Sequence, residues 1–173
     1  LFLSGTRIHE PGVRFADFRV LDVSSIQSPK LVGYTPPPSA YGEYRNFTLR
    51  NNTAYVFNYS GLDGAMAVFD ANGSSSPTLR SLYWQLMGTD VLVEGDTAYV
   101  ASLSGLYVLY ALDASAVTVI LHYEKYFNAI GSLALSPSRI YLRDAEEKPT
   151  NPLHVLSRPV DPGAEPSYLG VVQ

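Results

Sequence analysis

Short apolar runs alternate with turn residues along the whole chain. The runs are rich in Val, Leu, Tyr and Phe, and pairs such as Asn51-Asn52 and Gly95-Asp96 separate them. Aromatic and β-branched residues between turn signals are typical of strands. No segment carries a sustained helical period with capping residues. The pattern therefore predicts an all-β fold.

The strand pattern repeats at an interval of about 44 residues, the length of a typical structural repeat. The run NTAYV at 52–56 returns as DTAYV at 96–100, and a weaker copy follows at 138–142. A second element begins as FRVLD, and its four copies lie at 18–22, 66–70, 106–110 and 153–157. The chain is therefore built from about four similar units.

These units predict a β-propeller portion with about four four-stranded blades. Four-stranded units of roughly 40–50 residues are typical of propeller blades, which bury their faces only against neighbouring blades. A β-sandwich is the alternative, but it does not explain a repeat of this length. The whole chain, 1–173, is expected to be one propeller domain or a fragment of one, with blades at 1–34, 46–83, 90–123 and 132–172.

The repeat also resembles a known family. The run VLDVS at 20–24, followed by SPKLVG at 28–33, is similar to the LVIVD-type propeller repeat, and TAYVA at 97–101 resembles its preceding part. Tyr110 and Ser157 replace the aspartate of this motif in the third and fourth copies. The resemblance implies a cell-surface or secreted propeller, mostly without an assigned reaction.

The first blade is shorter than the others in this register. Residues 1–4 match a second strand, so 1–34 supply three strands of a blade whose innermost strand is absent. A closed propeller needs complete blades. We expect either the C-terminal part of a larger propeller, or a strand supplied in cis or by a partner chain.

Composition and charge exclude several classes of partner. The net charge is −4 and no Lys/Arg cluster exists, so a nucleic-acid partner is not expected. No apolar run approaches the roughly 20 residues of a membrane-spanning helix. Cysteine is absent, which excludes disulfides, cysteine-ligated zinc and thiol catalysis.

Asn-x-Ser/Thr triplets lie close together between residues 46 and 74. They predict N-glycosylation of an exported protein, because such acceptors occupy exposed loops. The alternative is that Asn, Ser and Thr gather at strand turns, where their side chains bond the backbone. The candidate acceptors are Asn46, Asn51, Asn58 and Asn72. Together with the family resemblance, they favour a secreted or cell-surface location.

Aromatic residues gather in the connections between the expected blades. On one face of a propeller they would anchor a protein or glycan partner. Their recurrence at the same place in each repeat favours the alternative, packing between blades. The candidates are Tyr41, Tyr44, Trp84, Tyr123, Tyr126 and Phe127.

The sequence contains no catalytic motif. The run DANG at 70–73 resembles the start of a calcium loop but lacks the closing acid, and Asp22 occupies the matching position, so a turn cap is predicted. His9, His122 and His154 have no metal-ligand spacing, and structural roles are expected for the last two. No Gly-x-Ser-x-Gly elbow or phosphate loop occurs.

We therefore expect a non-enzymatic scaffold without cofactor or metal, which binds a protein or a glycan. Two alternatives stay open. One is a structural component of a surface layer or filament. The other is part of a secreted propeller enzyme whose site is assembled across blades.

Overall fold

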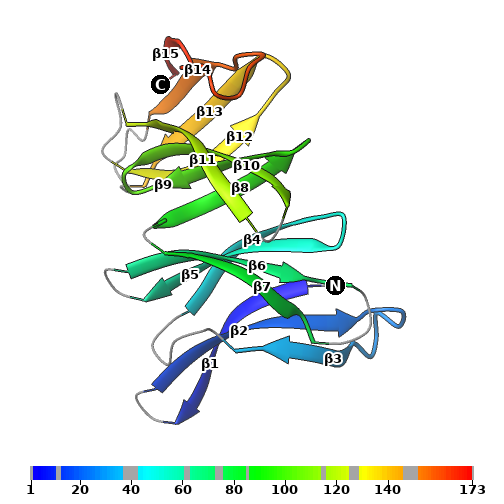
Figure 1. Cartoon of the computed structure of the whole chain (residues 1–173). Helices are drawn as coiled ribbons and strands as arrows, with labels where there is room; N and C mark the ends of the chain where they lie inside the picture. Colours follow the sequence, from blue (N-terminus) through cyan, green and yellow to red (C-terminus); the bar gives the residue numbers. More distant parts are fainter. Residues whose placement is uncertain are drawn as a thin grey trace. The chain divides into compact units, whose positions relative to one another are not determined.

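The computed structural model is all-β in the part of the chain that it describes (Figure 1). This part comprises residues 2–10, 13–36, 43–60, 63–72, 76–84, 86–113, 116–124, 129–145 and 152–172. Its strands form antiparallel sheets, and within these ranges no helix is long and apolar enough to cross a membrane. The prediction of an all-β fold is confirmed.

Four sheets follow one another along the chain, and in each one the strands pair in chain order (Figure 1). Sheet 1 contains β1 (Phe2–Glu10), β2 (Val13–Asp22) and β3 (Lys30–Thr35). Sheet 2 contains β4 (Glu43–Arg50), β5 (Thr53–Ser60), β6 (Asp63–Asp70) and β7 (Thr78–Trp84). Sheet 3 contains β8 (Gly88–Glu94), β9 (Thr97–Ser102), β10 (Gly105–Asp113) and β11 (Ala116–Tyr123). Sheet 4 contains β12 (Ile130–Leu135), β13 (Arg139–Asp144), β14 (Leu153–Ser157) and β15 (Tyr168–Val172).

The chain divides into two compact units with two sheets each. Unit 1, Leu1–Leu86, holds sheets 1 and 2, and unit 2, Met87–Gln173, holds sheets 3 and 4. The three strands expected within 1–34 are β1 to β3, and the later sheets lie within a few residues of the expected boundaries.

The turns between strands follow from their residue types. Asn51 and Asn52 have positive φ angles of 44° and 62°, which suits the tight hairpin between β4 and β5. Gly95, with φ 59°, begins the two-residue turn between β8 and β9. Asparagine and glycine tolerate this left-handed backbone better than other residues.

A β-bulge recurs at the same position in the last strand of every sheet. In each case one residue of the last strand has no direct partner in the preceding strand. The four unpaired residues are Val32 in β3, Arg80 in β7, Ile120 in β11 and Leu169 in β15. The bulges lie opposite the third and fourth residues of the FRVLD-type element, so the repeat extends to backbone register. A bulge on an edge strand also hinders pairing with another chain.

The core of unit 1 is aromatic. Phe18 of β2 is fully buried and stacks on Phe69 of β6, with ring centroids 5.5 Å apart. Phe47 of β4 meets Phe18 edge-on at 5.4 Å, and Tyr44 meets Phe69 edge-on at 5.7 Å. Offset and edge-to-face arrangements are the favourable ones for aromatic rings. These rings join sheet 1 to sheet 2.

The core of unit 2 is mainly aliphatic. Buried side chains from sheets 3 and 4 pack in one cluster, which includes Leu106, Val108, Ile130, Ile140, Leu142 and Leu156. Tyr99 and Tyr123 contribute aromatic rings to the same cluster. Sheet 3 therefore packs on sheet 4 through branched aliphatic residues.

Candidate binding surfaces

The aromatic residues expected at the connections divide into buried and exposed ones. Tyr44 is 3% exposed and Tyr123 is 4% exposed, so neither ring is available to a ligand. Their assignment to a binding face is wrong, and the alternative of packing holds for both. Trp84, in contrast, is 55% exposed. Tyr41, Tyr126 and Phe127 lie outside the described residues.

Tyr44 is buried because its ring completes the aromatic core of unit 1. The ring contacts Phe69, and the hydroxyl donates a hydrogen bond to the Pro36 carbonyl at 3.2 Å. Burial raises the pKa of Tyr44 above the ordinary tyrosine value, so its hydroxyl stays protonated and remains a donor. The connection preceding β4 is thereby held to sheet 2.

Trp84 is the last residue of the edge strand β7. It pairs with Ala65 at the start of β6, whose small side chain leaves the indole without a large cross-strand neighbour. Trp84 is also the only tryptophan of the chain. A large exposed indole on a strand is the type of group that anchors a partner.

The candidate glycan acceptors occupy different positions on sheet 2. Asn51 is exposed at the tip of the β4–β5 hairpin, and Asn72 is exposed just after β6. Asn46 is exposed within β4. Asn58 lies in β5, and its side chain is outside the described part. Glycosylation of these residues stays a prediction, with Asn51 and Asn72 at the turn positions that suit it best.

The predicted aspartate turn caps are confirmed. The Asp22 carboxylate accepts the Ser24 backbone N–H at 2.8 Å, and the Asp70 carboxylate accepts the Asn72 backbone N–H at 3.1 Å. The Ser24 bond lowers the pKa of Asp22. The guanidinium of Arg80, with the Asn72 bond added, lowers the pKa of Asp70. These carboxylates stabilise turns after equivalent strands.

His154 has the structural role expected from the sequence. It is buried in β14, where its Nδ1 lies 3.1 Å from the Tyr168 hydroxyl and its Nε2 lies 3.3 Å from an Asp144 carboxylate oxygen. Three neighbouring strands of sheet 4 supply these groups. The side chain of His9 lies outside the described part.

His122, by contrast, belongs to an exposed polar cluster that sequence reasoning missed. Its ring stacks on Tyr107 with centroids 4.0 Å apart and an interplanar angle of 8°. Its Nε2 lies 2.9 Å from the main-chain carbonyl of Ser104. The Ser104 hydroxyl lies 3.0 Å from the Tyr107 hydroxyl and 3.2 Å from that of Ser102. We call Ser102, Ser104, Tyr107 and His122 the sheet 3 cluster.

The bulge of sheet 3 produces this ring stack. Leu109 pairs with Val119, so an unbroken ladder would place Tyr107 opposite Leu121. Because Ile120 is bulged, Tyr107 instead pairs with His122. A sequence pattern alone does not locate such a bulge, and this is why the pair was not foreseen.

Gly105 allows the turn of the sheet 3 cluster to lie close to β11. Its φ is 127°, and a Cβ atom at this position would lie 2.5 Å from the Tyr123 carbonyl oxygen. Any other residue would push β10 away from β11 at this end of the sheet. Gly105 therefore holds the Ser104 turn beside His122.

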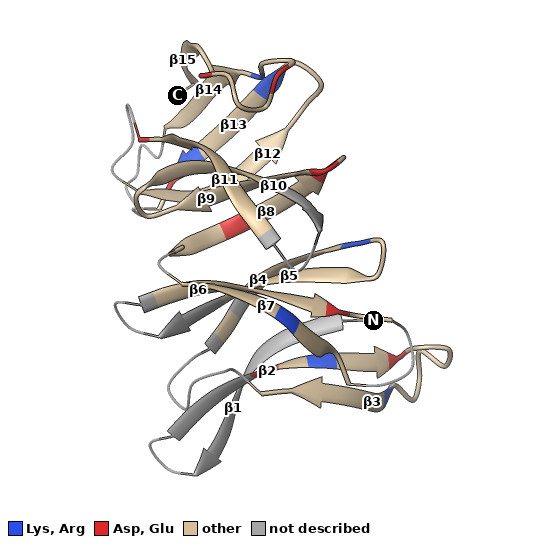
Figure 2. Ribbon diagram, in the orientation of Figure 1, with Lys and Arg blue, Asp and Glu red and all other residues tan. Residues whose placement is uncertain are grey.

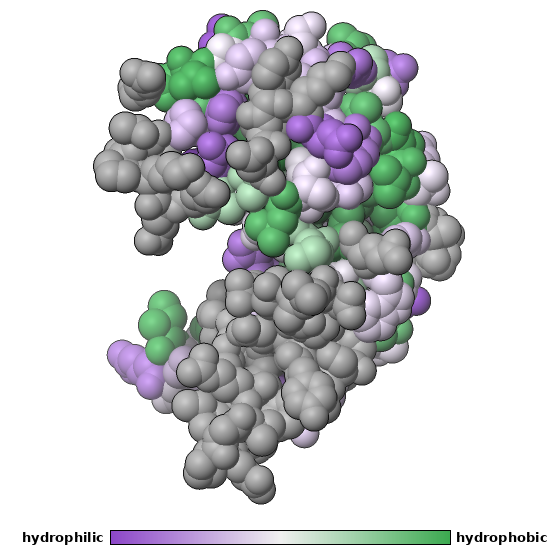
Figure 3. All heavy atoms as spheres, turned by 90° about the vertical axis from the view of Figure 1, so that its left-hand side faces the viewer, coloured by the Kyte–Doolittle hydropathy of each residue, from purple (hydrophilic) through white to green (hydrophobic). Residues whose placement is uncertain are grey.

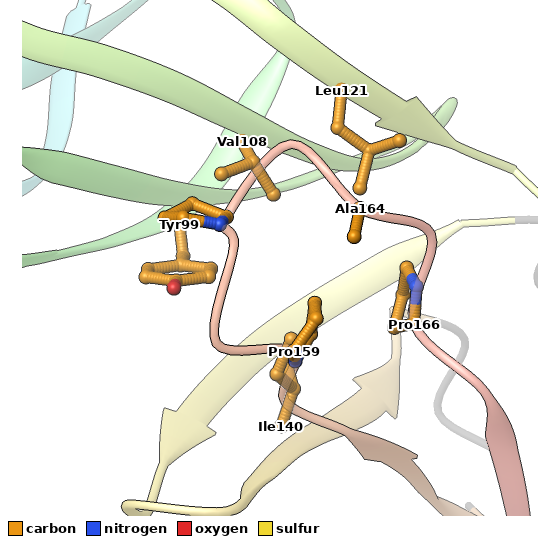
Figure 4. A pocket seen from close by; sticks show the side chains of 8 residues that line it. Tyr99, Val108, Leu121, Ile140, Pro159, Ala164 and Pro166 are labelled. Carbon is orange, nitrogen blue, oxygen red and sulfur yellow. The ribbon is translucent and has the colours of Figure 1, made fainter.

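A proline-rich loop closes the seam between sheets 3 and 4 (Figure 4). Tyr99, Val108 and Leu121 of sheet 3 and Ile140 of sheet 4 line the seam, and the loop between β14 and β15 contributes Pro159, Pro162, Ala164 and Pro166. The seam leaves no space for a water molecule. It is thus a packed junction between the two sheets and the loop.

Charged residues are sparse, and most of the described ribbon carries neither sign (Figure 2). Within the described ranges, no three histidine or acidic side chains converge as the ligands of a metal ion would. Large apolar side chains instead reach the surface on the edge strands, among them Leu31, Tyr34, Val119 and Val172. In the face that Figure 3 shows, hydrophobic residues are scattered at the surface among hydrophilic ones.

Comparison with models of known protein families gives no match, and a search of functionally curated proteins gives no significant match. The resemblance to the LVIVD-type repeat therefore stays a prediction. The functional inference depends on the surfaces described above.

Proposed function

We propose that the chain forms part of a β-propeller of the LVIVD-repeat type that serves as a non-enzymatic binding scaffold, secreted or at the cell surface. The four sheets are consecutive blades, and the partner is a protein or a glycan. The common strand order, the bulge common to every last strand and the aspartate caps support the blade assignment.

The exposure of Trp84 carries the binding proposal. Tyr44 and Tyr123 are buried in sheet packing, whereas the indole of Trp84 is directed to solvent from the end of a strand. Leaving this surface exposed to water is unfavourable by about 25 cal/mol per Å² of apolar area, and a partner that covers it gains that free energy. Exposed aromatic residues on rigid elements dominate binding energy at protein interfaces.

The single tryptophan makes the binding test direct. The full chain is screened against a glycan array and a library of extracellular protein domains. Each hit is titrated by calorimetry, which also serves the variant without tryptophan, and Trp84 emission is recorded in addition for the parent. We expect a saturable change in emission, and a Trp84→Ala variant that binds at least tenfold more weakly. Leu79→Ala is the matched control, because Leu79 is also exposed and apolar on β7.

The melting temperature separates binding from folding in this experiment. Trp84→Ala is expected to melt within about 2 °C of the parent, because an exposed side chain contributes little to stability. If Trp84→Ala retains full affinity for every hit, the anchoring role of Trp84 is wrong.

If the protein is exported and N-glycosylated, removal of N-glycans should lower its intact mass. The intact mass of the protein isolated from its source is measured under denaturing conditions, before and after enzymatic removal of N-glycans. A loss of mass on treatment supports a glycosylated scaffold, and the loss should be smaller in the Asn51→Gln variant. A mass that does not change on treatment contradicts glycosylation.

A structural component of a surface layer or filament is the second candidate. It is favoured by the apolar residues exposed on the edge strands, since such strands pair readily with other chains. This candidate predicts a native mass far above that of the monomer by light scattering. A monomer at about 100 µM, a concentration at which weak assemblies form, contradicts it.

A further inference from the structure

The sheet 3 cluster has a fixed arrangement of hydrogen-bonding groups. A carbonyl oxygen only accepts hydrogen bonds, so the Nε2 of His122 donates to the Ser104 carbonyl. With Nε2 as the donor, the uncharged form of the imidazole has its lone pair on Nδ1. His122 is exposed, and this lone pair is an acceptor for a ligand.

Hydroxyl groups supply the donors of the cluster. The hydroxyls of Ser102, Ser104 and Tyr107 form a chain, with separations of 3.2 Å and 3.0 Å. Ser102 is fully buried, and its hydroxyl oxygen also accepts the Ser104 backbone N–H at 3.2 Å. This bond anchors the row of hydroxyls to β9. Each hydroxyl has one hydrogen and two lone pairs, so the group both donates and accepts.

The ring stack gives the cluster a flat apolar face. One side of the His122 ring is covered by Tyr107, and the interplanar angle of 8° keeps the two rings nearly parallel. The imidazole is thus held in one orientation before a ligand binds, which reduces the entropy lost on binding.

We propose that the sheet 3 cluster is a binding site for a neutral saccharide. The C–H face of a pyranose ring packs on the outer face of the His122 imidazole, and its hydroxyls bond Nδ1 and the Ser104 and Tyr107 hydroxyls. The recognising groups are uncharged, and they offer both donors and acceptors, as sugar hydroxyls require. This inference rests on the proposed function, because it specifies the glycan partner. The residues that would bind the saccharide do not include Trp84.

The test uses the full chain with isotope-labelled histidine. The chain has three histidines, so the ring signals of His122 are assigned by comparison with the His122→Ala variant. Methyl glycosides of glucose, galactose, mannose and N-acetylglucosamine are titrated to about 50 mM, a range that detects millimolar affinity. We expect saturable shifts of the His122 ring signals with at least one glycoside, at a millimolar dissociation constant.

Two variants and two controls assign the site. His122→Ala lacks the ring signal, so its binding is followed by the backbone amide shift of Ser104 in uniformly labelled protein. It should weaken binding about tenfold or more, because the platform is lost. Tyr107→Phe keeps the ring stack and removes one hydroxyl, and it should weaken binding about threefold to tenfold. Val119→Ala on β11 and Tyr110→Phe on β10 change exposed residues away from the cluster, and we expect both to bind as the parent does.

The outcomes separate this inference from the proposed function. If no glycoside shifts the His122 signals, or if His122→Ala binds as tightly as the parent, the saccharide site is wrong. In either case a partner that still requires Trp84 leaves the proposed function intact. Glycoside binding that survives Trp84→Ala but is lost in His122→Ala supports the inference even if Trp84 is not an anchor.

Discussion

Each unit packs its own two antiparallel sheets against each other. The side chains at this contact differ between unit 1 and unit 2. In unit 1 the contact consists largely of aromatic rings, centred on Phe18 and Phe69. In unit 2 it consists of Leu, Ile and Val side chains, with polar contacts around the apolar cluster. The same strand order therefore tolerates two kinds of core.

The polar contacts of unit 2 connect sheet 3 to sheet 4 directly. The Thr89 hydroxyl donates to the Ile130 carbonyl, and an Asp90 carboxylate oxygen accepts the Leu133 N–H at 3.0 Å. In unit 1 the Thr35 hydroxyl donates to the Pro77 carbonyl at 2.6 Å, and the Tyr44 hydroxyl donates to the Pro36 carbonyl at 3.2 Å. Flat rings fix their own packing geometry, whereas aliphatic side chains slide more easily. Both units therefore have hydrogen bonds between their sheets, and in unit 2 these bonds accompany an aliphatic core.

Arg158 makes the most extensive of these polar contacts. Its guanidinium donates to the Tyr99 hydroxyl and the Ser136 carbonyl, pairs with Glu94 and lies 5.2 Å from the centre of the Tyr99 ring. Burial alone would lower the pKa of Arg158, but the bonds to Tyr99 and Glu94 raise it above the ordinary value. Arg158 thus joins the proline-rich loop of sheet 4 to sheet 3.

The largest effect is expected from the aromatic core of unit 1. Phe69→Ala removes a fully buried ring that contacts Phe18 and Tyr44, so it should lower the free energy of unfolding by about 3–5 kcal/mol. Hydrogen exchange of the full chain should show the loss of protection mainly in β2 and β4 to β7. Leu142→Ala, in the core of unit 2, is the matched variant, and we expect a loss nearer 2–4 kcal/mol. If Phe69→Ala lowers protection equally in all strands, these rings do not stabilise unit 1 in particular.

The second effect concerns the Arg158 contacts. Arg158→Met keeps much of the apolar stem and removes the hydrogen bonds, and it should destabilise unit 2 by about 1–3 kcal/mol. Glu94→Gln should cost less than about 1 kcal/mol, because Glu94 is more than half exposed and solvent screens the pair. Urea unfolding of both variants and of the double variant gives the coupling energy. A Glu94→Gln loss as large as that of Arg158→Met would show that the ion pair, and not the loop anchoring, is the main contribution.

The third effect concerns the alignment of the first strands of sheets 3 and 4. Asp90→Ala leaves the Leu133 N–H without its acceptor and should cost about 1–2 kcal/mol. Asp90→Asn keeps one carbonyl oxygen and should cost about half as much. Hydrogen exchange at the Leu133 amide measures the effect directly. Protection of this amide that is unchanged in Asp90→Ala would mean that another group replaces the carboxylate.

The sequence predicted the strands and their repeat well, because both depend on local patterns. Alternating apolar runs and turn pairs such as Asn51-Asn52 carry this information within a few residues. The aspartate caps were also predictable, since Asp22 and Asp70 bond backbone groups only two residues away.

What the sequence did not predict depends on distant neighbours. Tyr44 and Trp84 look alike as aromatic residues near connections, yet Tyr44 meets Phe69 whereas Trp84 faces the small Ala65. The Tyr107–His122 stack was missed because a bulge shifts the register of β11 by one residue. Burial and register are set by partners far along the chain, and a single sequence does not identify those partners.

The smallest expected effect is a difference in salt dependence between the two aspartate caps of unit 1. Both have a pKa below that of an unfolded aspartate, about 3.9, so each stabilises the folded state above that pH. This stability is lost as the pH falls through about 4 toward the lower folded-state value. Asp22→Asn and Asp70→Asn should each flatten the fall in melting temperature below pH 4. Added salt should weaken the Asp70 effect more, because the exposed bond to Arg80 is an ion pair that salt screens, whereas Asp22 is bonded by the uncharged backbone and side chain of Ser24. Identical salt dependence in the two variants would mean that Arg80 adds nothing to the cap of β6.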